Sequence, residues 1–160
     1  MKRLPLLFTI IFFLAACGDN YICPKDPLFP AFINYSTQDI DTIYLEVYQK
    51  GTNFSTRLNT IRLDRGNTSF EIAGDTAKMF MGRIADRLTD EYDYRFVNPT
   101  DNKKVSVTDL KYTLYEGRRG GLFGWDSQDC NSPLVSYKRD GVEVIVPAQN
   151  IVANFVYITK

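Results

Sequence analysis

Residues 42–63, TIYLEVYQKGTNFSTRLNTIRL, contain two runs of alternating apolar and polar residues joined by a turn. In the first run Ile43, Leu45 and Val47 occupy every second position, a period that is typical of a strand with one buried face. The segment Gly51-Thr52-Asn53 supplies turn residues, and apolar side chains recur after it. The stretch therefore predicts two antiparallel strands.

The same period of two recurs along the chain. Apolar residues in the two halves of Lys104–Tyr115 have opposite parity, which predicts a β-bulge near Asp109. The dipeptide Asp140-Gly141 lies between two apolar runs and predicts a tight hairpin. Besides the pair at 42–63, the predicted strands are Ala31–Tyr35, Thr68–Ile72, Asp93–Asn98, Lys104–Tyr115, Leu134–Lys138, Val142–Val146 and Val152–Ile158.

Residues 75–91 fit two patterns. Phe80, Ile84 and Leu88 recur at helical spacing, whereas Phe80, Gly82 and Ile84 alternate as on a strand. We favour a strand over Lys78–Ile84, with a short helix as the alternative. Roughly seven to nine short strands with little helix, and no alternation of strands with helices, predict an antiparallel β-sandwich over residues 30–160, immunoglobulin-like or transthyretin-like.

The first sixteen residues have the pattern of an export signal. Lys2 and Arg3 precede an apolar run from Leu4 to Leu14, which is shorter than the roughly 20 residues that a spanning helix needs. We therefore expect residues 1–16 to be a signal peptide and residues 17–29 to be a tether.

The sequence Leu14-Ala15-Ala16-Cys17 resembles the lipobox of bacterial lipoproteins. The resemblance implies that Cys17 becomes the mature N-terminus and carries acyl chains such as palmitate, so that membrane lipid is the first expected partner. More than one acyl chain gives stable anchoring without a spanning segment. Because Gly18, and not aspartate, follows Cys17, the resemblance favours the outer membrane of the cell envelope.

Composition excludes several classes of function. The chain has 19 basic and 19 acidic side chains, and this balance argues against binding of nucleic acid. It has no histidine, which excludes a Ser-His-Asp triad and an imidazole metal site. We therefore predict no enzyme, no metal and no cofactor. The densest acidic cluster comprises Asp86, Asp90, Glu91 and Asp93. Paired carboxylates in this cluster could serve a hydrolase, but we favour a solvated turn that leads into a strand.

Apart from Cys17, the chain has two cysteines, Cys23 and Cys130. A pair of cysteines in an exported chain predicts a disulfide bond. The alternative is two buried free thiols.

Residues 117–125, GRRGGLFGW, hold the only tryptophan of the chain. They predict a binding loop in which Arg118 and Arg119 engage an anion, while Phe123 and Trp125 offer apolar contact. The alternative is a loop whose apolar residues pack against the core.

The arrangement of the whole chain resembles small envelope lipoproteins of Bacteroidota type, with a lipidated cysteine, an early second cysteine and one sandwich with a late cysteine. We expect a non-enzymatic binding or scaffolding module whose partner is an envelope protein or a glycan. The alternatives are a carbohydrate-binding module that uses Trp125 and an accessory lipoprotein of a secretion system.

Overall fold

The computed structural model describes residues 20–118, 131–147 and 154–160. This part of the chain is nearly all β, with one short 3₁₀ helix, η1 (Gly82–Arg87). The strands are β1 (Asn20–Ile22), β2 (Leu28–Ile33), β3 (Thr42–Gln49), β4 (Arg57–Asp64), β5 (Ser69–Ala73), β6 (Thr76–Phe80), β7 (Tyr92–Asn98), β8 (Lys103–Tyr112), β9 (Glu116–Arg118), β10 (Leu134–Arg139), β11 (Val142–Ile145) and β12 (Asn154–Thr159).

The chain divides into two compact units, which are described separately. The smaller unit comprises Met1–Pro24 and Leu114–Ser132, and the larger comprises Lys25–Thr113 and Pro133–Lys160. In the smaller unit β1 pairs antiparallel with β9. Ser132 links its two segments, because its Oγ donates to the carbonyl of Cys23 at 3.0 Å and accepts from the amide of Tyr115 at 3.2 Å.

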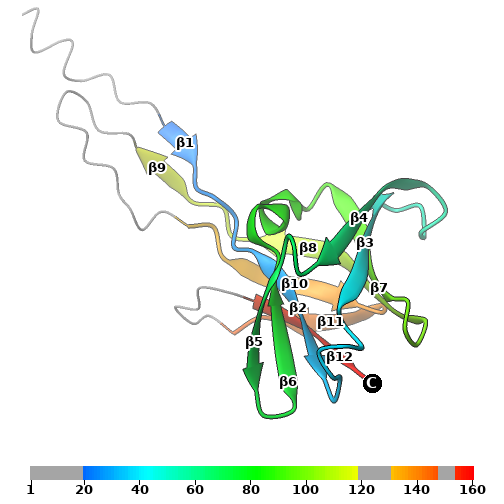
Figure 1. Ribbon diagram of the computed structural model, residues 1–160. Helices are drawn as coiled ribbons and strands as arrows, with labels where there is room; N and C mark the ends of the chain where they lie inside the picture. Colours follow the sequence, from blue (N-terminus) through cyan, green and yellow to red (C-terminus); the bar gives the residue numbers. More distant parts are fainter. Residues whose placement is uncertain (1–19, 119–130, 148–153) are drawn as a thin grey trace, which may run out of the picture. The chain divides into compact units, whose positions relative to one another are not determined.

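The larger unit is a sandwich of two sheets, which confirms the predicted fold class (Figure 1). One sheet has six strands in the order β11-β10-β8-β7-β3-β4, and the other has four in the order β12-β2-β6-β5. Alternate residues of β3 and β7 point into the core, where Ile43, Leu45, Tyr94 and Phe96 are at most 2% exposed. The period of two in the sequence therefore identifies the buried face of the six-stranded sheet.

The four-stranded sheet departs from a purely antiparallel arrangement. β12 pairs parallel with β2 over Asn154–Thr159 and Leu28–Ile33. β2 also begins three residues before the predicted strand, so Leu28 and Phe29 belong to the sandwich and not to a tether over 17–29. Pro30 is tolerated there because antiparallel pairing of β2 with β6 extends only from Ala31 to Ile33.

The predicted strand over Lys78–Ile84 is wrong after Phe80. β6 ends at Phe80, and η1 follows. Gly82 has a φ of +50°, a left-handed conformation that ends an extended strand. Three buried side chains anchor η1 in the hydrophobic core. They are Ala85 within the helix and the flanking Met81 and Leu88, which are 2%, 0% and 4% exposed. The helical alternative therefore describes this segment better, in its short 3₁₀ form.

The predicted bulge in β8 is confirmed. Lys138 of β10 faces Thr108, and Ser136 faces Lys111, so a single residue of β10 opposes both Asp109 and Leu110. Asp109 takes a left-handed φ of +51°. The bulge reverses the parity of β8, and Leu110 is consequently 3% exposed.

The predicted Asp-Gly hairpin is also confirmed, between β10 and β11. Asp140 and Gly141 have φ values of +50° and +83°, the signs that a type I′ turn requires at both central residues. A Cβ at Gly141 would meet no atom within 4 Å, so there is room for a larger side chain at this position. The positive φ alone therefore favours glycine here.

Gly141→Ala should lower the free energy of unfolding by about 1 kcal/mol, because an L-residue with a side chain is strained in the left-handed region. Gly141→Asn should cost only a few tenths of a kcal/mol, since asparagine tolerates this region. Urea unfolding of the two variants checks the difference. Equal stability of both variants would contradict the assigned turn.

Candidate functional site

Most of the predicted site residues lie outside the described part of the chain. Cys17, Arg119, Phe123, Trp125 and Cys130 all belong to that group. Arg118 ends β9, but its side chain is not among those described. Cys23 is described and is 3% exposed.

The acidic cluster does not form a paired-carboxylate site among the described side chains. η1 ends at Arg87, so Asp86 and Asp90 do not share a helix. Asp90 forms an ion pair with Lys25, and the hydrogen bond from that ammonium holds the pKa of Asp90 below its usual range. Asp93 is 4% exposed, and its Oδ2 accepts from the amide of Gly51 at 2.9 Å. Both carboxylates are thus engaged in structural contacts.

Among the described residues, no group of three or more acidic or cysteine side chains could hold a metal ion. Within the same residues, no helix is long and apolar enough to cross a membrane.

The described part of the chain contains a groove of about 580 Å³. We call it the β11–β12 groove, because it lies between the two strands that end the six-stranded and the four-stranded sheets. β10 and β6 complete it. Its lining residues are Lys78, Tyr137, Arg139, Val144, Ile145, Val146, Pro147, Asn154, Phe155 and Tyr157.

One wall of the groove is fixed by side chains of β10 that cap the backbone of β12. The Tyr137 hydroxyl donates to the carbonyl of Phe155 at 3.2 Å, and Arg139 Nη1 donates to the carbonyl of Tyr157 at 3.1 Å. Burial raises the pKa of Tyr137, so its hydroxyl stays protonated and remains a donor. These contacts close the outer edge of β12 and hold the two sheets together at the groove.

The apolar part of the groove rests on an aromatic cluster. Phe155 lies 5.7 Å from Phe80 and 6.0 Å from Phe29, measured between ring centroids. Valines 144 and 146 and Pro147 supply an aliphatic wall. A ligand that fills this groove must therefore carry apolar groups.

The charged groups of the groove are hydrogen-bond donors, and Asn154 adds an amide with a donor nitrogen and an acceptor oxygen. The Lys78 ammonium lies 5.4 Å from the centroid of Phe155 and also pairs with Glu71 at 3.3 Å. Arg139 donates from one guanidinium nitrogen to the backbone of β12. The residue is exposed, so solvent or a ligand can reach its other N–H groups. The lining includes no aspartate or glutamate. Electrostatics in the groove therefore favour an acceptor or an anion.

Asn154 provides the most specific feature of the groove. The residue is 7% exposed, and its Nδ2 has no hydrogen-bond partner in the described structure. A buried unsatisfied donor costs about 1–3 kcal/mol. Asn98 Nδ2 is also unpartnered, but Asn98 lines none of the described pockets, and its Oδ1 already accepts from the amide of Thr100. Asn154 therefore places a buried, unsatisfied donor beside the groove.

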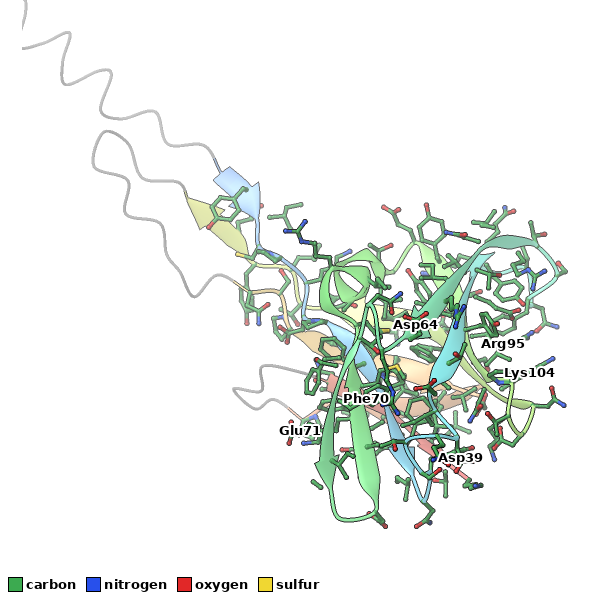
Figure 2. The ribbon with its side chains drawn as sticks, in the orientation of Figure 1. Asp39, Asp64, Phe70, Glu71, Arg95 and Lys104 are labelled. Atoms are coloured by element: carbon green, nitrogen blue, oxygen red, sulfur yellow. The ribbon has the colours of Figure 1, made fainter. Side chains whose placement is uncertain are left out.

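A second polar cluster, on the outer face of the six-stranded sheet, is better explained as structure. Arg95 and Lys104 of this sheet are labelled in Figure 2. The guanidinium of Arg95 stacks 4.2 Å above the ring of Phe54, and Tyr48 beneath them is 5% exposed. The Tyr48 hydroxyl donates to Glu46 at 2.6 Å. The contacts among Arg95, Phe54, Tyr48 and Glu46 therefore give these groups a structural role.

Comparison of the chain with protein-family models, with curated proteins and with solved structures found no match. The β11–β12 groove was not predicted from the sequence, because its residues come from four strands and follow no motif. The nearest signal is the run Val142–Val146, which the sequence assigns to an ordinary strand.

Proposed function

We propose that the protein is a lipid-anchored, non-enzymatic binding module of the cell envelope. Cys17 would carry the acyl chains, with the outer membrane as the favoured location. The β11–β12 groove would hold an apolar segment of an envelope polypeptide that carries a carboxylate. The anchor is supported by the lipobox at Leu14–Cys17, and the binding role is supported by the groove.

The unsatisfied Nδ2 of Asn154 carries this proposal. Nδ2 is buried as well as unpaired in the free protein, so an acceptor that reaches it after local opening of the groove would satisfy that donor. Arg139 and Lys78 line the same groove and add positive charge around that donor. A carboxylate matches these groups in both charge and hydrogen-bonding capacity.

A polypeptide fits the groove better than a glycan does. Sugar rings are held by exposed aromatic faces, and the groove offers one such ring, Tyr157, which is 45% exposed. Its remaining apolar lining is mainly aliphatic. The carbohydrate alternative depends on Trp125, which lies outside the described residues.

A disulfide between Cys23 and Cys130 forms part of the proposal. Cys23 is buried, and its carbonyl accepts from Ser132, two residues after Cys130 in the sequence. A bond that closes so long a loop would contribute about 4–5 kcal/mol on the chain-entropy model.

Binding of a blocked, fluorescein-labelled peptide of four valines around one aspartate tests the groove. Asn154→Asp should weaken binding at least about tenfold, because it replaces two donors by acceptors and adds a negative charge next to the ligand carboxylate. Arg139→Gln should weaken binding by a similar factor. Fluorescence anisotropy measures the affinities.

Arg62→Gln on β4 is the matched control, because this exposed arginine pairs with Asp64 and does not line the groove. Its affinity should equal that of the parent protein. Equal binding of a peptide with lysine in place of aspartate would contradict the proposed chemistry, as would absence of binding by the parent.

A further inference from the structure

β11 ends the six-stranded sheet, and no described strand pairs with its outer edge. The strand carries no lysine, proline or bulge within Val142–Ile145, although it is only four residues long, bears Glu143 and is followed by Pro147. Val142 and Ile145 are 68% and 67% exposed. The strand thus presents an unpaired edge with exposed apolar side chains.

The hairpin turn determines which backbone groups face outward. Arg139 and Val142 flank the two-residue turn and form the first hydrogen-bonded pair, and such pairs then alternate along the ladder. The amide of Val146 donates to the carbonyl of Val135 at 2.9 Å, which fits this alternation. The N–H and C=O groups of Val142, Val144 and Val146 therefore point toward β10. Those of Glu143 and Ile145 point away from the sheet.

A second β11 can pair with these outward groups in one symmetric register. When the two strands run antiparallel about Val144, Glu143 of each copy faces Ile145 of the other and exchanges both backbone hydrogen bonds with it. Val144 then faces its own symmetry mate, and Val142 faces Val146. The pairing places an unbroken row of valines on one face and brings no like charges directly opposite each other.

The other described edges are less suited to such pairing. In β5 the corresponding symmetric register would place Glu71, labelled in Figure 2, opposite its own copy, and like charges directly opposite are destabilising. The edge of β12 is capped by Tyr137 and Arg139. β4 carries Arg57 and Arg62.

We infer that β11 is a self-association edge, through which a second copy of this chain joins the six-stranded sheet antiparallel, with its two-fold axis at Val144. Two-fold symmetric dimers are the commonest oligomers, and their interfaces must be self-complementary. The contact is made by the edge of β11, although Val144 and Val146 also line the groove. The inference goes beyond the binding role and does not rest on it.

Val144→Cys in the full-length, membrane-bound protein tests the register. Opposed Cα atoms of a non-hydrogen-bonded antiparallel pair lie about 4.5 Å apart, within the range that a disulfide spans. Mild oxidation with copper phenanthroline removes two protons and two electrons from the two thiols. A dimer band should appear on a non-reducing gel, disappear on reduction, and be absent for the parent protein with its natural cysteines.

Val142→Cys is the matched control, because it lies on the same strand and the same face. In the inferred register its two copies are about 13 Å apart, too far for a disulfide. Equal crosslinking of both variants, no crosslinking of Val144→Cys, or crosslinking of it to a different protein would overturn the inference.

A second measurement covers the case in which a cysteine disturbs the strand. Sedimentation of the detergent-solubilised parent should give a dimer, and Ile145→Pro should give a monomer, because proline removes an outward N–H without removing a bond to β10. Ile145→Thr keeps that N–H and should remain a dimer. A monomeric parent protein would overturn the inference.

Discussion

Replacement of Cys17 by serine should abolish acylation of the protein completely. The parent protein, labelled with palmitate in the producing cells, should carry the label, and Cys17→Ser should carry none, because the sulfur that accepts the first acyl chains is gone. Each buried methylene of an acyl chain contributes roughly 0.8 kcal/mol to membrane binding. On the proposed anchor, the loss of two or three chains would therefore remove most of the free energy of membrane binding.

Cys23→Ser and Cys130→Ser serve as controls for this experiment, since both should keep the label. Mass spectrometry of the unreduced parent protein should find the acyl mass on the peptide that begins at Cys17. It should also find Cys23 and Cys130 in one linked peptide. Acylation at another residue, or an unmodified N-terminus, would contradict the proposed anchor.

Phe32→Ala should lower the free energy of unfolding by about 3–5 kcal/mol, the range observed when a large buried aromatic side chain is removed. Phe32 lies in β2, is 0% exposed, and meets the ring of Tyr35 edge-to-face at a centroid distance of 5.7 Å. Small domains are stable by only about 5–15 kcal/mol in total. The variant should therefore lose a large share of the stability of the sandwich.

Urea unfolding monitored by circular dichroism measures this loss. Ile72→Ala on β5 is the control, because Ile72 is 61% exposed and its truncation should change stability by no more than about 0.5 kcal/mol. A cost below about 1 kcal/mol for Phe32→Ala would contradict the packing of β2 between its neighbours.

Local signals in the sequence account for much of the fold. Ile43 and Leu45 alternate with polar residues, and both are buried as predicted. Asp140-Gly141 forms the predicted turn, and the change of parity near Asp109 marks the bulge. These features depend on two to four neighbouring residues, so they can be read without knowledge of the rest of the fold.

Edges and tertiary pairings could not be predicted in this way. Leu58 and Ile72 belong to apolar runs, yet they are 54% and 61% exposed, because β4 and β5 end their sheets. The sequence does not say which strands become edges, since that depends on how the two sheets assemble. For the same reason it did not reveal the β11–β12 groove, whose walls come from edges of different sheets. The strand over 78–84 was wrong because the left-handed conformation of Gly82 was not anticipated.

The binding role depends on the groove and on Asn154 in particular, and nuclear magnetic resonance can observe that side chain directly. In the ¹⁵N-labelled protein, addition of the valine–aspartate peptide should shift the Asn154 side-chain NH₂ signals together with the amides of Val144 and Phe155. The lysine peptide should leave all of them in place. Shifts confined to the outer face of the six-stranded sheet, around Arg95 and Lys104, with unchanged Asn154 signals would contradict the proposed function.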